Sequence, residues 1–251
     1  MNSTGARALI DVLLEQGVDT VFGYPGSAVL DIYDELYKCD KIRHILTCHE
    51  QAAAHAADGY ARATGRTGVV IATSGPGATN LVTGIAAAYM DSSPVVAITG
   101  NVKTSLLGSD SFQEVDIAGV TMPVTKYSFI ASGERGVAQD VREAFSIAQS
   151  GRKGPVLVDI PADIAAQSEE YERAPKSEPA RAKEPEEAQL ARAAQMIAKA
   201  KRPLIYVGGG AISSGASDAL KTFAQKLHIP VACSMMGLGA YPCSAELFLG
   251  L

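Results

Sequence analysis

Short, continuous apolar runs that alternate with amphipathic runs are the feature that most restricts the fold of this sequence. Up to about residue 165, apolar stretches such as GVVIAT (68–73), PVVAIT (94–99) and PVLVDIP (155–161) are separated by segments with helical periodicity. A strand that is apolar throughout must be covered on both faces, and strands joined by helices run parallel. We therefore expect residues 1–165 to form an α/β domain with a six-stranded parallel sheet and helices on both faces.

Local signals place the elements of this expected domain. Ser3 or Thr4 can cap a helix that runs to about Gln16, because short polar side chains satisfy the open N–H groups of a first turn. The six expected strands are residues 19–23, 42–47, 68–73, 94–99, 126–131 and 155–161. Further helices are expected over 28–38, the alanine-rich stretch to residue 65, 81–91 and 136–150. The intervening SGPGATN (74–80) is expected to be a tight turn, and 100–116 an irregular polar stretch.

The character of the chain changes after this domain. Residues 166–185 are charged and contain three prolines and almost no large aliphatic side chain, which is typical of a linker. A second α/β pattern fills residues 186–251, with helices and strands expected in the order 186–200, 203–210, 216–228 and 229–233. Two strands are too few for an independent parallel sheet. We therefore expect this segment to be the start of a Rossmann-like domain, and the chain to be the front part of a longer protein.

Bulk composition excludes several classes of protein. The chain is 47% hydrophobic and 20% charged, an ordinary globular balance. With a net charge of −5 and no basic run, it is not expected to bind nucleic acid, and no apolar run is long enough to cross a membrane. The four cysteines have no CxxC spacing and the N-terminus lacks a signal-peptide pattern. These features favour a reduced, cytoplasmic protein.

One carboxylate, Glu50, stands where an expected strand meets the alanine-rich helix, in LTCHEQAAAHAADGYARATG (46–65). The simplest explanation is the helix dipole, which favours negative charge in a first turn. A zinc site is disfavoured, because His49 and His55 are six residues apart and so point roughly 120° away from each other on a helix. The remaining interpretation is a functional carboxylate beside a cofactor pocket.

Ligands of open parallel sheets bind beyond the carboxyl ends of the strands. Three expected loops of that kind carry suggestive residues: YPGS (24–27), the segment at Glu50, and SGPGATN (74–80). The last resembles a phosphate loop but lacks the lysine of GxxxxGK[ST], and a tight turn explains it equally well.

Two further features are ambiguous when taken alone. Phe112 and Gln113 lie in the long irregular stretch, where they either face a pocket or belong to a solvated loop. Gly208, Gly209 and Gly210 follow an expected strand and precede a helix, which is a weak nucleotide-binding signal.

These motifs gain meaning from their order along the chain. The informative segments are FGYPGSAVLDIYDEL, HEQAAAHAADGYARATG, VVIATSGPGATNLVTGIAAAYMDSSPVVAITG, SDSFQEVD, PVTKYSF and SGRKGPVLVDIP. In this order they resemble the thiamine diphosphate enzymes that act on 2-keto acids, above all the catalytic subunits of acetolactate synthase (acetohydroxyacid synthase). The resemblance implies that residues 1–165 are the pyrimidine-binding domain. It also implies that residues 186–251 begin the central domain, with YVGGGA and SMMGLGAYP as markers.

The same resemblance implies roles for individual residues. Glu50 would hydrogen-bond N1′ of the cofactor's aminopyrimidine and share a proton that activates the cofactor, and Gln113 would lie near the reacting carbon. The chemistry belongs to the cofactor, while the protein orients and protonates it. Positions around the thiamine ring are matched by Thr73, Pro76 and Asn80. The Mg²⁺ and diphosphate ligands belong to a GDG motif beyond Leu251, so no metal ligand is expected in this chain.

A second cofactor, a mainly structural FAD, is also implied by the resemblance. The residues that match its contacts are Asp91, Arg152, Gly208, Gly209, Gly210, Ser234 and Met235. The triple glycine suits this role, because a backbone without Cβ atoms permits close approach of a phosphate or ribityl chain.

The implied function is a carboligase that decarboxylates pyruvate and joins the hydroxyethyl unit to a second 2-keto acid, in branched-chain amino acid biosynthesis. A homodimer or tetramer with a regulatory small subunit is implied, and the fragment alone is expected to be inactive. Ser27 and Ala162 depart from the family pattern of glycine and lysine, which bears on the second substrate. The alternatives are a 2-keto acid decarboxylase or pyruvate oxidase, a non-catalytic flavin- or nucleotide-binding module, and a purely structural domain.

Overall fold

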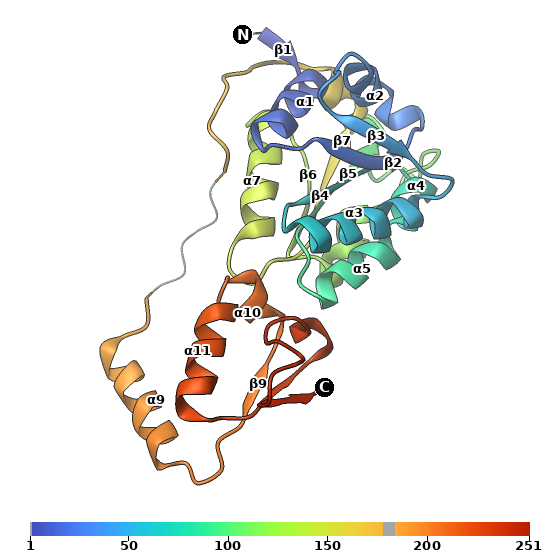
Figure 1. Cartoon of the computed structure of the whole chain (residues 1–251). Helices are drawn as coiled ribbons and strands as arrows, with labels where there is room; N and C mark the ends of the chain where they lie inside the picture. The colour runs from blue at the N-terminus through green and yellow to red at the C-terminus, as the bar shows by residue number, and fades with distance from the viewer. Residues whose placement is uncertain (1, 178–183) are drawn as a thin grey trace. The chain divides into compact units, whose positions relative to one another are not determined.

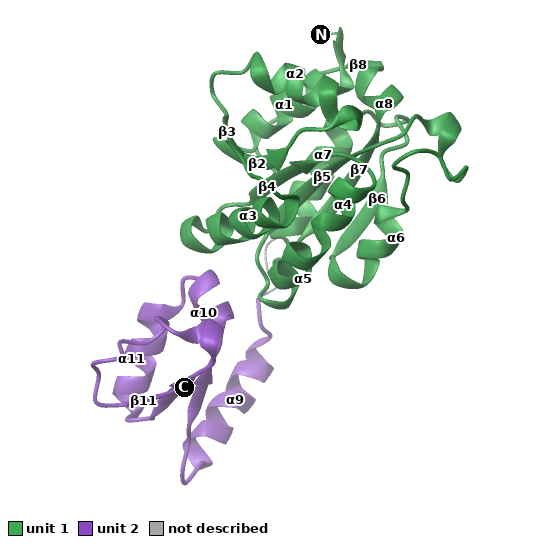
Figure 2. Ribbon diagram, turned by 90° about the vertical axis from the view of Figure 1, so that its right-hand side faces the viewer, with its two compact units in different colours: residues 1–181 green, residues 182–251 purple. Residues whose placement is uncertain are grey.

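The computed structural model describes residues 2–177 and 184–251. The chain divides into two compact units, Met1–Arg181 and Ala182–Leu251 (Figures 1 and 2). The first unit carries most of the residues that the sequence singles out.

A six-stranded sheet forms the centre of the first unit. Its order is β3 (Arg43–Leu46), β2 (Thr20–Tyr24), β4 (Gly68–Ala72), β5 (Val95–Asn101), β7 (Val156–Pro161) and β6 (Tyr127–Ile130). Every adjacent pair is parallel, which confirms the expected sheet. All residues of β4, β5 and β7 are buried, because helices cover both faces of these central strands.

The two faces of the sheet support separate cores. One core packs the sheet against α1 (Gly5–Glu15), α2 (Leu30–Tyr37), α7 (Val137–Gln149) and α8 (Ala162–Ala166). The other packs it against α3 (Glu50–Thr64), α4 (Pro76–Asn80), α5 (Val82–Met90) and α6 (Ile117–Thr121). Alternate residues of one strand serve the two cores: Val69 and Ile71 face one, and Val70 faces the other.

The expected helix boundaries follow from local chemistry. Thr4 caps α1, its Oγ1 accepting a hydrogen bond from the N–H of Arg7 at 3.2 Å. Gly65 ends α3 in the left-handed conformation, with φ of 71°. Residues 74–80, expected as a turn only, contain the short helix α4. Three 3₁₀ turns were not expected either: η1 (Ser27–Val29), η2 (Thr104–Leu106) and η3 (Met122–Val124).

The segment expected to be a linker is partly built into the first unit. Strand β8 (Ser168–Glu170) pairs antiparallel with β1 (Asn2–Thr4), so the unit has a small second sheet that the sequence did not suggest. The chain then stays attached as far as Ser177, whose N–H donates to Oε1 of Gln16 at 3.1 Å. The compact unit therefore extends beyond residue 165, and residues 178–183 of the expected linker lie outside the described residues.

The second unit has a smaller sheet of three parallel strands. These are β9 (Ile205–Val207), β10 (Val231–Cys233) and β11 (Phe248–Gly250), in the order β11-β10-β9. The third strand adds to the two that were expected. Helices α9 (Glu187–Lys199), α10 (Gly209–Ser213) and α11 (Ser217–Leu227) and the 3₁₀ turn η4 (Met235–Gly237) accompany them. Within the described part of either unit, every helix is too short or too polar to span a lipid bilayer.

Candidate functional site

The site begins with Glu50, which opens α3 directly after the carboxyl end of β3. The preceding residue, His49, caps this helix, because its Nδ1 accepts a hydrogen bond from the N–H of Gln51 at 3.1 Å. The carboxylate therefore lies at the positive end of a helix of 15 residues, where negative charge is favoured. Its side chain is half-buried rather than fully solvated.

Glu50 is held by a residue from the next loop along the sheet. Nδ2 of Asn80, at the end of α4, donates to Oε2 of Glu50 at 2.9 Å. The other carboxylate oxygen, Oε1, accepts no hydrogen bond from the described residues. The structure thus joins two of the residues predicted from the sequence and leaves one oxygen of Glu50 for a further donor.

A glycine explains how the backbone of α4 comes so close to this carboxylate. A Cβ on Gly77 would lie 2.7 Å from Cγ2 of Thr73 and 3.3 Å from Oε1 of Glu50. Any larger residue would therefore collide with the Thr73 side chain and crowd the Glu50 carboxylate. Pro76 starts the same helix at a position whose missing N–H costs no intrahelical hydrogen bond.

Thr73 lies between the loop that follows β4 and the YPGS loop that follows β2. Its Oγ1 accepts a hydrogen bond from the N–H of Ala28 at 3.2 Å. A Cβ on Gly26 would lie 2.5 Å from the Thr73 side chain, so the YPGS turn packs directly on it. Ser27, one of the two departures from the family pattern, is exposed at the start of η1. The predicted residues Glu50, Thr73, Pro76 and Asn80 therefore share one end of the sheet.

Gln113 is brought to the same loops by an irregular backbone. It has a φ of 58°, in the left-handed region that a residue with a side chain adopts rarely. Gly75, with the same φ of 58°, meets it so closely that an added Cβ would lie 2.7 Å from the Gln113 carbonyl oxygen. Phe112 is 85% exposed, so the structure places it on the surface rather than in a pocket of this unit.

The stretch that carries Gln113 is fixed at both ends. At its start, Asp163 accepts hydrogen bonds from the N–H of Thr104 at 2.9 Å and from its hydroxyl at 2.5 Å. Near its end, the Glu114 carboxylate accepts from the N–H groups of Gly108 and Ser111, which lowers the pKa of Glu114. The polar stretch is thus a closed loop with its own hydrogen bonds.

A buried carboxylate beneath this loop was missed at the sequence level. Asp159 of β7 is completely buried, and it accepts hydrogen bonds from Oγ1 of Thr99 at 2.6 Å and from Nδ2 of Asn101. Burial raises its pKa to about 7, against the opposing effect of these two donors. Oδ1 of Asn101 in turn accepts from the N–H of Val102, where the loop leaves β5.

Tyr33 is a second group that sequence reasoning missed. Its hydroxyl lies 3.2 Å from Nε2 of His44. Burial, and then the negative charge of Glu50, raises the pKa of Tyr33, while burial lowers the pKa of His44. Gly23 makes room for the phenol, because an added Cβ would lie 2.5 Å from its oxygen. Only this glycine, in the middle of an apolar strand, hinted at the close approach.

The residues assigned to FAD fall into two groups. In the first unit, Asp91 at the end of α5 pairs with Arg62 at 2.8 Å, and Arg152 donates to Oγ of Ser92 at 2.7 Å. Both precede strands, so they lie at the end of the sheet opposite to Glu50. This group gives the first unit a polar cluster that is distinct from the Glu50 site.

The second group lies in the second unit, after strands β9 and β10. Gly208 precedes α10, which starts at Gly209 and Gly210, and a Cβ on Gly209 would lie 2.9 Å from the Met236 carbonyl oxygen. The N–H of Ser234 donates to the Val207 carbonyl at 2.9 Å, and Met235, which starts η4, is 69% exposed. The two strand-end loops therefore lie side by side, and the glycines permit that contact.

No three histidine, cysteine, aspartate or glutamate side chains come together as a metal site within residues 2–177 and 184–251. Asn80 and Glu50 form a hydrogen-bonded pair, not a cation cage.

Comparison with known proteins gives the class to which this fold and site belong. A family model for the thiamine pyrophosphate enzyme N-terminal TPP-binding domain matches residues 3–120, and the model for the central domain of the same enzymes matches residues 190–251. The chain belongs to the thiamine pyrophosphate enzymes.

Individual relatives narrow this class. The chain is 49% identical over 253 residues to the acetolactate synthase isozyme 3 large subunit of Escherichia coli K12, with 99% of this chain and 44% of that protein covered. It is 50% identical over 253 residues to the acetolactate synthase large subunit of Corynebacterium glutamicum, with 99% and 40% covered. It is also 50% identical over 256 residues to the acetolactate synthase of Arthrospira platensis, with 99% and 44% covered. The chain thus spans less than half the length of these relatives.

Proposed function

We propose that the whole protein is a thiamine diphosphate-dependent acetolactate synthase. It decarboxylates pyruvate and joins the hydroxyethyl unit to a second 2-keto acid, a step of branched-chain amino acid biosynthesis. The observation that carries this proposal is the Glu50 carboxylate at the start of α3, with one oxygen held by Asn80 and the other open beside Gly77. The relatives, all named acetolactate synthase, support the choice of reaction.

The residues of the site fit the aminopyrimidine part of thiamine diphosphate. Gly26 and Gly77 pack directly against the Thr73 side chain, so no side chain from either position crowds Oε1 of Glu50. This carboxylate oxygen accepts no hydrogen bond from the described residues, which suits a ring nitrogen that can carry a proton. Bound there, the cofactor supplies the carbon that attacks the 2-keto acid.

The roles of the chain's own residues follow from their contacts. Glu50 would share a proton with the ring nitrogen of the cofactor, and Asn80 holds the carboxylate through Oε2, which leaves Oε1 for that role. Thr73 and Pro76 would line the site that holds the ring. Gln113, held in its unusual backbone conformation by the contact with Gly75, orients the reacting group. Positioning of this sort supplies a large share of catalysis when the group is rigidly held.

The remaining partners and the domain roles are part of the same proposal. Residues 1–165, with the segment to Ser177 that packs on them, act as the pyrimidine-binding domain, and residues 186–251 begin the central domain. Mg²⁺ and the diphosphate are held by a third domain that this chain does not contain. The residues that would contact FAD are Asp91 and Arg152 in the first unit and Gly208, Gly209, Gly210, Ser234 and Met235 in the second, and the enzyme would work in the cytoplasm. It assembles as a homodimer or tetramer and pairs with a regulatory small subunit, as the "large subunit" in the names of two of these relatives suggests.

Product analysis of the full-length protein with pyruvate tests the reaction. Acetolactate as the main product supports the proposal. Acetaldehyde or acetyl phosphate would instead show a decarboxylase or an oxidase built on the same domain. Reversible flavin redox chemistry without carboligation would identify the alternative, a flavin-binding module centred on Gly208–Gly210.

A further inference from the structure

Three polar side chains are buried together near the carboxyl ends of strands β5 and β7: Thr99, Asn101 and Asp159. Thr99 lies opposite Asp159 in the parallel register, and Asn101 lies two residues further along β5, on the same face of the sheet. The two carboxylate oxygens of Asp159 accept one hydrogen bond each, Oδ1 from Thr99 at 2.6 Å and Oδ2 from Nδ2 of Asn101. Within the described part of the chain, no lysine, arginine or histidine pairs with this carboxylate.

Packing alone does not explain the buried carboxylate. All six residues of β7 are buried, and apart from Asp159 they are apolar. Exchanging hydrogen-bonded partners in a core for apolar side chains of the same shape is often nearly neutral for stability. A further aliphatic side chain at position 159 would therefore serve the core, and the polar group points to a role outside it.

Asn101 connects this carboxylate to the loop that carries Gln113. Its Oδ1 accepts a hydrogen bond at 2.8 Å from the N–H of Val102, the first residue after β5. Its Nδ2 donates to Asp159, and this contact fixes the orientation of the amide. A flipped amide would set Nδ2 against the N–H of Val102, two donors against each other. Asp159 and Asn101 together therefore hold the peptide group at which the chain leaves the sheet.

The loop of residues 102–116 returns to the same place. Asp163, which follows β7, accepts hydrogen bonds from the N–H and the hydroxyl of Thr104. At the far end of the loop, Asp116 caps α6. Its negative charge adds to the effect of burial in raising the pKa of Asp159, so it lies near this carboxylate. Both ends of the 102–116 loop are thus held close to the end of β7.

Gln113 lies between these two anchored ends, in a conformation that depends on them. Its φ of 58° is unusual for a residue with a side chain, and such a conformation persists only where the surrounding structure determines it. Gly75 presses on its backbone from one side. A loop released at Val102 can relax this backbone, and the Gln113 side chain would then point elsewhere.

We propose that Asn101, oriented by Asp159, is a positioning residue for Gln113. It fixes the start of the 102–116 loop and so holds Gln113 in its left-handed conformation. The catalytic part of this inference rests on the proposed function, because it needs Gln113 to take part in the reaction. The structural part, a loop held by Asn101, stands without it.

Hydrogen–deuterium exchange of the full-length protein tests the structural part. Asn101→Leu keeps the branched shape of the side chain and removes both of its contacts. We expect amides of the 102–116 loop to exchange about two- to tenfold faster, the factor that corresponds to one net hydrogen bond. Amides of α3 should exchange as before, and Asn101→Ala takes the place of the leucine variant if that variant does not fold. Unchanged exchange of the loop in a folded variant would overturn the proposal.

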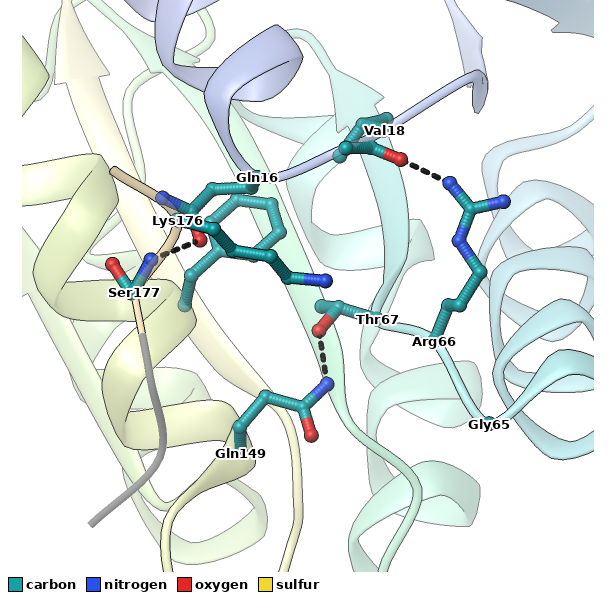
Figure 3. A pocket seen from close by; sticks show the side chains of 10 residues that line it. Gln16, Val18, Gly65, Arg66, Thr67, Gln149, Lys176 and Ser177 are labelled. Atoms are coloured by element: carbon teal, nitrogen blue, oxygen red, sulfur yellow. Dashed lines mark hydrogen bonds between the residues drawn. The ribbon is translucent and has the colours of Figure 1, made fainter. Parts of the chain in front are cut away.

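Matched variants show whether a loss of stability alone loosens the loop. Thr99→Val removes the other hydrogen bond of the same carboxylate and leaves both contacts of Asn101 in place. Gln149→Leu removes an amide hydrogen bond to Oγ1 of Thr67 at 2.6 Å, at the opposite end of the sheet (Figure 3). Neither variant should change exchange of the loop. Asp159→Asn should also keep the loop closed, because its amide oxygen can accept from Asn101. Equal loosening in Asn101→Leu and in either control would overturn the proposal.

Steady-state kinetics with pyruvate test the catalytic part. Asn101→Leu should lower kcat by up to about a hundredfold, the cost of a misplaced group. A double-mutant cycle with Gln113→Ala separates positioning from general damage. Because Asn101 acts through Gln113, Asn101→Leu should lower kcat little further once the Gln113 side chain is absent.

Two kinetic results would contradict this part. An unchanged kcat in Asn101→Leu, or losses that add fully in the double variant, would overturn the proposal. Normal turnover of Gln113→Ala alone would overturn the role of Gln113 in the proposed function and, with it, the catalytic part of this inference. The exchange measurement would still decide whether Asn101 holds the loop.

Discussion

At the scale of single residues, Glu50 is the group on which the proposed function depends. Glu50→Gln in the full-length protein keeps an oxygen that can accept from Asn80, but it cannot hold an acidic proton. General acid–base groups are typically worth about 10²–10⁴-fold, so kcat should fall by about that factor. Steady-state kinetics and the exchange rate of the cofactor's C2 proton measure the effect.

The control for this variant is another acid in a first helical turn. Asp31 lies in the first turn of α2 and is exposed. Asp31→Asn and Glu50→Gln should each cost only about 0.3–1 kcal/mol of stability, the usual value of a charge near a helix N-terminus. Only the Glu50 variant should lose turnover. Normal exchange of the C2 proton in the Glu50→Gln variant would show that Glu50 does not activate the cofactor and is only a charge at the end of a helix.

At the scale of elements, strands β5 and β7 share the buried carboxylate of Asp159. Its pKa rises from 3.8 to about 7 on folding, so the folded state binds this proton more tightly than the unfolded state. The resulting stability is full below about pH 4 and is lost as the pH rises through about 7, by at most about 1.4 kcal/mol per pH unit. Asp159→Asn should remove this component, since its amide can pair with Thr99 and Asn101.

Thermal melting of the two proteins at pH 5 and pH 8 measures this linkage. The wild type should lose more stability than Asp159→Asn between these values. Other ionisable groups contribute equally to both proteins, so the difference between them isolates Asp159. An identical pH response would mean that Asp159 is ionised throughout, and that its two donors outweigh its burial.

The segment after β8 is a second element-scale feature, because it completes the surroundings of Glu15. This carboxylate is buried against Arg142 at 2.8 Å, and it also accepts from the Tyr171 hydroxyl at 2.5 Å and the Ala174 N–H at 2.9 Å. A chain that ends at residue 165 loses the last two contacts and strand β8. It should be less stable than residues 1–177 by about 1–3 kcal/mol, the cost of a poorly satisfied buried group.

Chemical denaturation of the two fragments measures this difference. Tyr171→Phe in residues 1–177 is the matched control, because it removes the hydroxyl that donates to Glu15 and leaves the strand pairing. The stability of the Tyr171→Phe variant should lie between that of residues 1–165 and that of residues 1–177. Equal stability of the fragments would show that residues 166–177 act only as the linker that their composition indicates.

These elements show how far the sequence could lead. The parallel sheet was predictable because the central strands are almost entirely apolar, and Glu50 stood out because it begins an alanine-rich helix. The pairing of β1 with β8 was not predictable, since three-residue polar strands carry no periodic signal. Asp159 looked like one polar residue in an apolar run. Its role depends on Thr99 and Asn101, and only folding brings these three together. Gln16 and Ser177 likewise meet only in the folded unit.

At the scale of the whole molecule, residues 1–251 alone should show no acetolactate synthesis. The proposed diphosphate and Mg²⁺ ligands are absent from this chain, and that charged contact should supply much of the cofactor affinity. A product assay with pyruvate, thiamine diphosphate and Mg²⁺ measures this, with the full-length protein as the control. Turnover by the shorter chain would disprove the assignment of these ligands to another domain.

The carboxyl-end face of the first unit also bears on assembly. Exposed apolar side chains surround the strand ends near Glu50: Tyr24 at 43%, Leu30 at 59%, Leu46 at 62% and Phe112 at 85% exposure. Apolar side chains gathered beside a site are typical of an interaction surface. We therefore expect residues 1–251 to self-associate through this face, as the proposed homo-oligomer requires.

Sedimentation velocity over a range of concentrations measures that association. Leu46→Asp combined with Phe112→Ser should shift the chain toward the monomer, because both changes replace apolar contact area with polar groups. Tyr37→Ser combined with Met90→Ser alters side chains that are 90% and 72% exposed at the opposite ends of their helices, and it should leave association unchanged. A chain that stays monomeric at high concentration, or that responds equally to both pairs, would contradict the placement of the interface. Loss of self-association only in the variant with Leu46→Asp and Phe112→Ser would show that the chain assembles through the end of the sheet that carries Glu50.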